Sequence, residues 1–329
     1  MPRQLIGRAL AVAALAFMIS AAPAQASHPK QRVIRDVAYA PEQSAGSQGH
    51  LLDLYLPAHA RRPSPLVIWS HGSGWLAENG RQGADALADI LAPYGFAVAG
   101  VAIRSSANAQ FPGQLQDIHA AIRFLRRHAG RYGLDSRRFA IMGESSGGWT
   151  AAMAGVTGAG VQAVVPFYPP TDFLQMDRFM LEDCVPFNQI FGLTDCHADP
   201  NSPESLLLGC PIESCPDRVA RANPITYVDR HVPPFLIVHG QQDLFVPYEQ
   251  GALLYHALAR ACADATLFTL PNAGHGFVGD PPGLEDAAVT DGATVRSTKR
   301  CRTTRPRELA PSWDLIAGWL RDRLGVRRR

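Results

Sequence analysis

Short apolar segments recur along this chain and alternate with longer segments of helical periodicity. Apolar runs of roughly four to eight residues are typical of buried strands, and their alternation with helices indicates a mostly parallel sheet covered on both faces. The sequence therefore predicts an α/β fold of about eight strands, the first two paired as an antiparallel edge. The strands are expected at residues 33–39, 51–56, 66–70, 96–103, 139–142, 161–167, 235–238 and 266–270.

Two apolar stripes predict helices that pack against this sheet. In the first, the apolar residues follow the i, i+3, i+4, i+7 spacing of one helix face. Its members are Ile118, Ala121, Ile122 and Leu125. The second stripe lies near the C-terminus and contains Trp313, Ile316, Trp319, Leu320 and Leu324. We interpret both stripes as core packing rather than as binding faces.

Two regions interrupt the regular alternation. Residues 171–231 are rich in Pro, Asp and Cys, and we interpret them as an insertion over the active site, with short helices near 187–191 and 205–208. Residues 276–311 carry a basic run, which we expect to be a solvated loop. The run consists of Arg296, Lys299, Arg300, Arg302, Arg305 and Arg307.

The N-terminus has the features of an export signal. Arg3 and Arg8 precede an uncharged apolar run at 9–19, and Ala24-Gln25-Ala26 fits a cleavage site. The run is shorter than the roughly 20 residues that span a membrane. We therefore expect removal of residues 1–26, and a single domain over 27–329 in the periplasm or outside the cell. The chain's 31 basic and 29 acidic residues would then balance, which favours neither nucleic acid nor an acidic partner.

Cysteine usage agrees with an oxidising compartment. The six cysteines are Cys184, Cys196, Cys210, Cys215, Cys262 and Cys301. Among the 15 complete pairings that six cysteines allow, short loop closure favours Cys184 with Cys196 and Cys210 with Cys215, which would leave Cys262 with Cys301. The sequence has no paired CxxC units, no HExxH motif, no P-loop and no dinucleotide fingerprint. No metal or cofactor is expected.

The segment Gly143-Glu144-Ser145-Ser146-Gly147 carries the strongest chemical signal. It follows the strand expected at 139–142 and precedes a helix-forming stretch, which is the setting of a nucleophile elbow. The flanking glycines have a steric reason at such a sharp turn. Ser145 is the predicted nucleophile, although a Gly/Ser-rich loop that merely ends a strand would look similar. We expect the side chain of Glu144 to point away from the site.

A second motif, His71-Gly72-Ser73-Gly74-Trp75, follows the strand at 66–70 and precedes the elbow by about seventy residues. Acyl transfer places negative charge on the former carbonyl oxygen, and preorganised backbone N–H groups stabilise that charge. We expect Ser73, Gly74 and Ser146 to supply these N–H groups as an oxyanion hole. Trp75 and Trp149 could line the substrate pocket or pack in the core.

Asp243 and His275 complete the predicted site. Asp243 follows the strand at 235–238, and His275 follows the strand at 266–270. Taken alone, an aspartate in a turn or a histidine in a loop is ordinary. Together with Ser145 they appear in the order Ser, Asp, His that α/β hydrolases use. We expect His275 to act as the base and Asp243 to orient it.

These motifs resemble the bacterial esterase branch of the α/β hydrolases that includes hormone-sensitive-lipase-like enzymes. Further segments are similar to bifunctional feruloyl and acetylxylan esterases. They are Tyr168-Pro169-Pro170-Thr171-Asp172, Ser202-Pro203-Glu204-Ser205, Ala222-Asn223-Pro224-Ile225 and Pro233-Pro234-Phe235. The resemblance implies an α/β-hydrolase fold and a serine esterase without a cofactor. It also implies small-molecule or carbohydrate ester substrates, carrying short acyl or feruloyl groups, as on plant-wall carbohydrate.

Three other functions remain open from the sequence. A prolyl-oligopeptidase-like peptidase shares the order of the three residues, but such enzymes usually carry a large additional domain. A true lipase is disfavoured because the insertion lacks a long amphipathic lid helix. A catalytically inactive binding protein of the same fold would be expected to lack one of the three residues.

Overall fold

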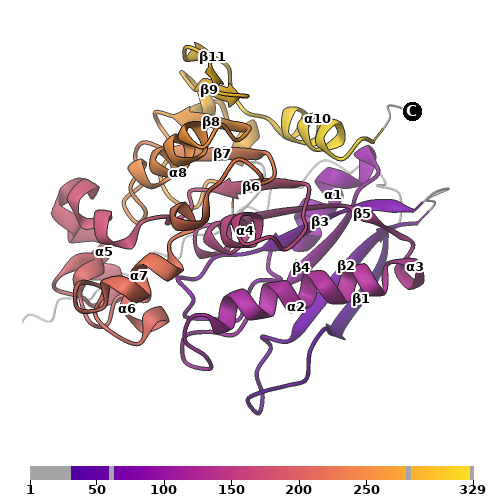
Figure 1. The fold of residues 1–329 in the computed structure, drawn as a ribbon, viewed down its shortest axis with the longest axis horizontal. Helices are drawn as coiled ribbons and strands as arrows, with labels where there is room; N and C mark the ends of the chain where they lie inside the picture. Colours follow the sequence, from indigo (N-terminus) through magenta and orange to yellow (C-terminus); the bar gives the residue numbers. More distant parts are fainter. Residues whose placement is uncertain (1–30, 59–62, 279–282, 327–329) are drawn as a thin grey trace, which may run out of the picture.

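One sheet of 11 strands runs through the computed structural model, which describes residues 31–58, 63–278 and 283–326. The expected signal peptide, residues 1–26, lies outside the described residues. The strand order is β1-β2-β4-β3-β5-β6-β7-β8-β9-β10, and β11 pairs with β9 (Figure 1). The strands are β1 (Gln31–Ala38), β2 (Leu51–Pro57), β3 (Ser64–Ser70), β4 (Ala97–Val101), β5 (Leu134–Glu144), β6 (Ala163–Phe167), β7 (Phe235–Gly240), β8 (Ala265–Leu270), β9 (Thr294–Lys299), β10 (Arg302–Thr303) and β11 (Arg307–Glu308).

The mostly parallel sheet predicted from the sequence is confirmed. β3 pairs in parallel with β4 and β5, and the parallel pairing continues through β6, β7 and β8. β1 and β2 form the expected antiparallel edge, and β2 also pairs antiparallel with β4. The carboxyl ends of the parallel strands share one edge, where ligands of open α/β sheets bind.

The expectation that residues 276–311 form a solvated loop is wrong in part. β9 pairs antiparallel with β8, and the short strands β10 and β11 fold back onto β9. The exposed residues Lys299, Arg300, Arg302, Arg305 and Arg307 lie on or beside these strands. Polar side chains suit this place because an edge strand leaves one side in water, and charges there oppose pairing with another chain.

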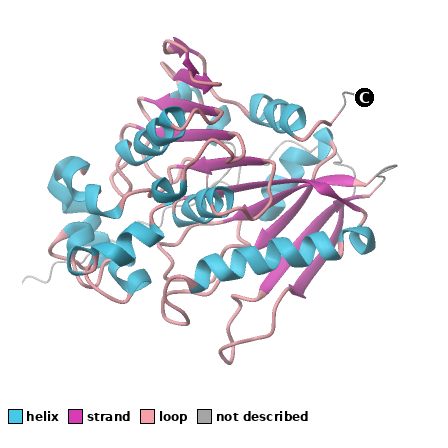
Figure 2. Ribbon diagram, in the orientation of Figure 1, coloured by secondary structure: helices cyan, strands magenta, loops and turns pink. Residues whose placement is uncertain are grey.

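Helices cover both faces of the sheet, as Figure 2 shows. The longer ones are α1 (Ala84–Leu91), α2 (Gly113–Arg127), α4 (Ser146–Val156), α8 (Glu249–Arg260) and α10 (Trp313–Arg323), and two short ones are α3 (Ala129–Tyr132) and α9 (Ala287–Thr290). Leu66 and Ile68 of β3 pack in the same core as α2, α4 and α8, whereas Val67 and Trp69 pack with α1 and α10. This alternation follows from the two-residue period of a strand. No described helix is long and apolar enough to cross a membrane.

The segment between β6 and β7 is the expected insertion. It contains α5 (Val185–Phe191), α6 (Pro203–Leu208) and α7 (Pro216–Ala222), so both short helices predicted there are present. Short 3₁₀ helices connect them: η2 (Phe173–Gln175), η3 (Asp177–Phe179), η4 (Leu181–Cys184), η5 (Cys196–Ala198), η6 (Ile212–Ser214) and η7 (Pro224–Tyr227), while η1 (Ala92–Tyr94) and η8 (Gly283–Glu285) lie elsewhere. Disulfides join Cys184 to Cys196 and Cys210 to Cys215, and a third joins Cys262 to Cys301. The predicted pairing is confirmed.

Candidate active site

Ser145 lies in a sharp turn between β5 and α4. Its backbone has φ 56° and ψ −127°, a conformation that L-residues rarely adopt. The glycines on both sides are needed for close packing. A Cβ atom on Gly147 would lie 1.9 Å from the carbonyl oxygen of Ser70, and one on Gly143 would lie 2.2 Å from the carbonyl oxygen of Gly147. The turn therefore has the strand-turn-helix geometry of a nucleophile elbow.

The structure brings Ser145, His275 and Asp243 together from three separate loops. His275 Nε2 lies 3.0 Å from Ser145 Oγ. On the other side of the ring, His275 Nδ1 lies 3.0 and 2.9 Å from the two carboxylate oxygens of Asp243. The resulting chain of hydrogen bonds joins a hydroxyl to an imidazole and a carboxylate, in the order that activates a serine.

Asp243 is held in place by backbone donors as well as by His275. The backbone N–H groups of Phe245 and Val246 each donate to its Oδ1 at 2.9 Å. The side chain is fully buried. Asp243 thus stabilises its own turn and also orients His275, because the oxygens of one carboxylate can accept more than two hydrogen bonds.

The charges of this hydrogen-bonded chain shift the pKa values of Asp243 and His275 in the directions that favour catalysis. Burial acts to raise the pKa of Asp243, but the neighbouring His275 and His239 hold that pKa well below its usual range. Burial acts to lower the pKa of His275, but the charge and hydrogen bond of Asp243, with the charge of Glu144, raise it above the usual value. Asp243 therefore stays ionised at neutral pH, and His275 is a stronger base than a free imidazole.

The loop after β3 supplies candidate oxyanion donors, with one correction. The backbone N–H of Ser73 donates to Ser146 Oγ at 2.9 Å, so it fixes the loop against the elbow and is not a free donor. Within the described residues, the backbone N–H groups of Gly74 and Ser146 donate no hydrogen bond. Gly74 and Trp75 have positive φ angles of 59° and 58°. Gly74 and Ser146 remain the candidate donors.

The expectation that Glu144 points away from the site is wrong. Its carboxylate accepts a hydrogen bond from the backbone N–H of Gly72 at 2.6 Å, and it lies 3.3 Å from His71 Nδ1. Glu144 also lines the cavity next to Ser145. The strained turn at Ser145 ends the alternation of the strand, so that alternation does not fix the direction of the side chain before it. Glu144 ties the elbow to the oxyanion loop.

A cavity of about 310 Å³ opens beside Ser145 and His275. Trp75 lines the cavity, but Trp149 does not. Trp149 is fully buried, and its Nε1 donates to the carbonyl oxygen of Ala222 at 2.7 Å. Its ring meets that of Trp75 edge-on with centroids 5.3 Å apart. The interpretation of Trp149 as a pocket residue is wrong: its bulk fills the core beneath the pocket.

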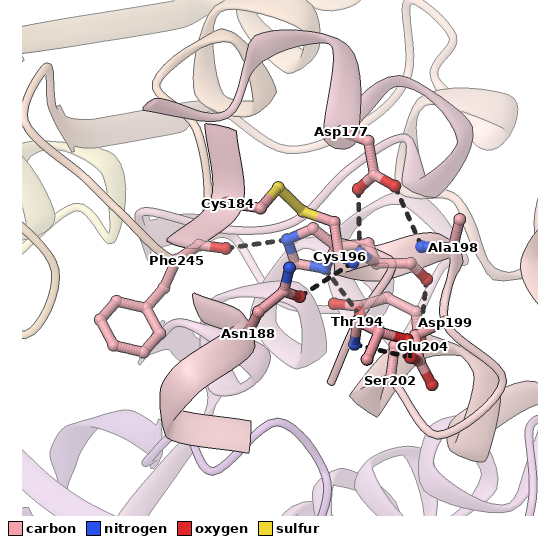
Figure 3. The surroundings of a disulfide bond; sticks show 11 residues. Asp177, Cys184, Asn188, Thr194, Cys196, Ala198, Asp199, Ser202, Glu204 and Phe245 are labelled. Atoms are coloured by element: carbon pink, nitrogen blue, oxygen red, sulfur yellow. Dashed lines mark hydrogen bonds and ion pairs between the residues drawn. A yellow bond between two sulfur atoms is a disulfide. The ribbon is translucent and has the colours of Figure 1, made fainter. Parts of the chain in front are cut away.

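The insertion supplies one wall of this cavity, as expected for a segment that covers the active site. Its contributors are Phe187, Phe191, His197, Pro203 and Glu204. The disulfide between Cys184 and Cys196 lies next to these residues and joins the end of η4, directly before α5, to η5 (Figure 3). Sequence reasoning did not identify any of the five as site residues. The one signal available was the motif at 202–205, which contributed to the family resemblance.

Asp177, Cys196 and His197 lie close enough together to suggest a metal centre. The donor atoms do not fit one. The sulfur of Cys196 is in a disulfide, and both ring nitrogens of His197 are hydrogen-bonded to other groups. A thiolate and a free imidazole nitrogen are what such a metal site requires. These residues therefore form a structural cluster in the insertion.

The fold and the elbow define an α/β hydrolase, in which Ser145, Asp243 and His275 follow one another in that order along the chain. The chain belongs to the BD-FAE family, whose model matches residues 52–258. A carbohydrate esterase from gut microbiota, solved in truncated form, is 27% identical with a TM-score of 0.69, covering 91% of this chain and 99% of that one. A bifunctional GH43-CE protein of Bacteroides eggerthii is 32% identical with a TM-score of 0.63, covering 74% of this chain and 35% of that one.

Curated relatives show the same resemblance over part of their length. Esterase LipQ of Mycobacterium tuberculosis is 27% identical over 263 residues, which cover 74% of this chain and 56% of LipQ. The probable carboxylic ester hydrolase LipM of the same organism is 26% identical over 269 residues, which cover 75% of this chain and 58% of LipM. The matched part of the chain thus spans little more than half the length of these relatives.

Proposed function

We propose that this protein is a serine carboxylic ester hydrolase that works through an acyl-enzyme. The observation that carries the proposal is the hydrogen-bonded chain from Ser145 Oγ through His275 to Asp243, at 3.0 and 2.9 Å, beside a cavity. Membership of the BD-FAE family supports it. The esterase names of LipQ and LipM support the same reaction class.

The geometry supports a two-step mechanism. His275 Nε2 takes the proton of Ser145 as the hydroxyl oxygen attacks the ester carbonyl, and the N–H groups of Gly74 and Ser146 bind the oxyanion. His275 then gives the proton to the leaving alkoxide, which departs as the alcohol. A water molecule attacks the acyl-enzyme by the same route and releases the acid. Asp243 keeps a proton on His275 Nδ1, so that Nε2 is the acceptor in each cycle.

We propose that the acyl group is short or carries a single aromatic ring, as in acetyl or feruloyl esters of carbohydrate. The cavity of about 310 Å³ is at the small end of ligand pockets. Phe187, Phe191 and Phe245 give it aromatic walls. The carbohydrate esterase that aligns with 91% of this chain supports a carbohydrate ester.

The proposed function is tested with a substrate series. We expect cleavage of at least one of 4-nitrophenyl acetate, 4-nitrophenyl butyrate, methyl ferulate and acetylated xylan. 4-Nitrophenyl decanoate should be cleaved at least about tenfold more slowly, because each methylene that does not fit in the cavity forgoes roughly 0.8 kcal/mol of burial free energy. A peptide 4-nitroanilide is included to detect a peptidase. Faster cleavage of the anilide than of every ester would favour the peptidase. No cleavage of any substrate would favour a binding protein.

The pH dependence of kcat/KM provides a further prediction. His275 acts only when neutral, and its pKa is raised. Activity should therefore fall with decreasing pH, with a midpoint above the usual imidazole value of about 6.5. Glu144→Gln keeps an acceptor for the N–H of Gly72 but removes a negative charge that raises this pKa, so the midpoint should move to lower pH. Initial rates between pH 5 and 9 measure it.

The matched control for the pH experiment is Glu78→Gln. Glu78 also accepts hydrogen bonds from backbone N–H groups, including that of Gly49 at 3.0 Å, but it does not line the cavity. Its pH profile should coincide with that of the wild type. A midpoint that stays unchanged in Glu144→Gln, or that moves equally in both variants, would show that Glu144 does not act on His275.

We also propose that the protein is exported to the periplasm or the outside of the cell. The arrangement of charge, apolar run and small residues in 1–26 supports this proposal. The three disulfides support it as well, because such bonds persist in oxidising compartments.

A further inference from the structure

Glu204 and His197 form a buried pair on the wall of the same cavity that contains Ser145. Their exposed fractions are 3% and 1%. One carboxylate oxygen of Glu204 lies 2.9 Å from His197 Nδ1, and His197 Nε2 lies 3.1 Å from the carbonyl oxygen of Phe245. The proposed reaction uses neither side chain. A buried titratable pair beside a nucleophile therefore requires another explanation.

The backbone around His197 is held in place from several sides. Asp177 accepts hydrogen bonds from the backbone N–H groups of His197 and Ala198, both at 3.0 Å, and Ser202 Oγ donates to the carbonyl oxygen of His197 at 2.7 Å. The disulfide of Cys196 adjoins these contacts, which Figure 3 shows for Asp177 and Ala198. The imidazole therefore presents Glu204 to the cavity in a fixed position.

The second carboxylate oxygen of Glu204 accepts no hydrogen bond from any described residue. An apolar ring covers one face of the pair, since the ring of Phe187 lies over that of His197 with centroids 4.1 Å apart. This oxygen is accessible rather than enclosed, and a carboxylate oxygen that meets a donor forms a strong hydrogen bond. Because Glu204 is almost fully buried and lines the cavity, the cavity is where this oxygen can meet a donor.

The charge state of the pair indicates which donor fits. Both ring nitrogens of His197 face acceptors, so the ring must carry both protons to donate to each of them. Burial acts to lower the pKa of His197, but the charges of Glu204 and Asp177 raise it. The imidazolium then balances the carboxylate of Glu204, the one that faces the cavity. Asp177 does not line the cavity, and its oxygens accept from the backbone N–H groups of His197 and Ala198. A neutral hydroxyl suits this pair better than an ammonium group, which would need an uncompensated negative charge.

The pair lies between the two sides of the catalytic centre. Pro203, the residue before Glu204, packs against the oxyanion loop, since a Cβ on Gly74 would lie 3.1 Å from its Cβ. On the other side, the ring of Phe245 lies 5.1 Å from that of His275, centroid to centroid. A substrate bound at Ser145 therefore occupies the cavity that Glu204 also lines.

We propose that the free carboxylate oxygen of Glu204 accepts a hydrogen bond from a hydroxyl group on a ring of the substrate, and so selects hydroxylated esters. The catalytic consequence rests on the proposed esterase function, but the binding consequence does not. The hydroxyl could come from a phenolic acyl group or from a sugar on the alcohol side. The phenolic ring and the sugar ring offer the same neutral hydroxyl donor, and each has a ring face that can pack on Phe187.

The test measures equilibrium binding to Ser145→Ala by calorimetry, which needs no turnover. The first pair of ligands is methyl 4-hydroxycinnamate and methyl cinnamate, and the second is an acetylated methyl xyloside and cyclohexyl acetate. In at least one pair the hydroxylated ligand should bind about tenfold to a hundredfold more tightly, the range of a hydrogen bond to a charged group. The pair that shows the preference identifies the source of the hydroxyl.

Variants of Glu204 in the Ser145→Ala background complete the test. Glu204→Ala should abolish the preference, and Glu204→Gln should reduce it, because an amide oxygen is a weaker acceptor than a carboxylate. Glu204→Gln decides the question if the alanine variant fails to fold. The control is Glu213→Gln, an exposed residue of the insertion outside the cavity, which should keep the preference.

Equal affinities within both pairs, or a preference unchanged in Glu204→Gln, would overturn the proposal. Failure of the esterase function would appear separately, as the absence of ester hydrolysis by the wild type.

Discussion

Replacing Ser145 with alanine is expected to lower the turnover of 4-nitrophenyl acetate about 10⁶-fold. The acyl-enzyme needs the oxygen of Ser145, and His275 Nε2, 3.0 Å away, has no other hydroxyl within that chain of hydrogen bonds to activate. Alanine keeps a Cβ atom at the turn, where φ is 56°. Since serine and alanine meet the same backbone strain there, the variant should fold, and its thermal unfolding should match that of the wild type.

Ser146→Ala is the matched control at the neighbouring position. It keeps the backbone N–H of residue 146 and removes only the hydroxyl that accepts from Ser73 at 2.9 Å. Even complete loss of one oxyanion donor costs about 10² to 10³ in rate, so this variant should remain far more active than Ser145→Ala. A reactive alkyl phosphonate should label the wild type and Ser146→Ala on Ser145, as seen by peptide mass spectrometry. Label on another serine, or activity in Ser145→Ala within about a hundredfold of the wild type, would contradict the assignment.

The central sheet was predictable from the sequence because buried parallel strands are apolar on both faces. β5 and β7 contain the runs Phe139 to Met142 and Phe235 to Val238, and no solvent-exposed pattern competes with that reading. β9 was not predictable in the same way. Its sequence, TVRSTK, is polar because the strand lies near the sheet edge. Its pairing with β8, β10 and β11 marks it as part of the sheet, and Cys301, just after it, is joined to Cys262.

The candidate site likewise has a part that was predictable from the sequence and a part that was not. Ser145, Asp243 and His275 each follow a buried strand, and the shared edge of parallel strands brings such residues together whatever the loops contain. Phe187, His197 and Glu204 were not predictable as site residues. Their positions depend on how the insertion folds back over the sheet, which its own contacts and disulfide determine. The three catalytic residues could thus be predicted from local sequence, whereas the residues of the pocket wall could be identified only from the tertiary structure.

Trp149 shows a different limit of sequence reasoning. A tryptophan four residues after the nucleophile could face either the cavity or the core, and its type alone does not distinguish these. The structure places it in the core, where its indole N–H finds the carbonyl oxygen of Ala222. A buried indole generally needs such a partner, and that partner is supplied by a residue more than seventy positions away.

Asp243→Asn is expected to lower turnover about 10⁴-fold. The asparagine oxygen can still accept from the N–H groups of Phe245 and Val246, both at 2.9 Å in the wild type, so the turn should persist. The amide NH₂ then faces His275 Nδ1 and favours the tautomer with the proton on Nε2. That tautomer cannot accept the proton of Ser145, because its only free lone pair is on the wrong nitrogen. Rates with 4-nitrophenyl acetate at neutral pH measure the loss.

The control that isolates this effect is Asp199→Asn. Asp199 is also buried, and it accepts hydrogen bonds from the backbone N–H groups of Thr194 and Asn201 at 3.0 and 2.9 Å, but it does not line the cavity. Its variant loses the same charge without touching His275 and, because the two N–H groups bind different carboxylate oxygens, it also loses one of these hydrogen bonds. The turnover of the folded variant should stay within about tenfold of the wild type. If Asp199→Asn lost as much activity as Asp243→Asn, the loss would reflect the stability of the loops. If Asp243→Asn kept most of its activity, the charge of Asp243 would not be what prepares His275 to accept the proton.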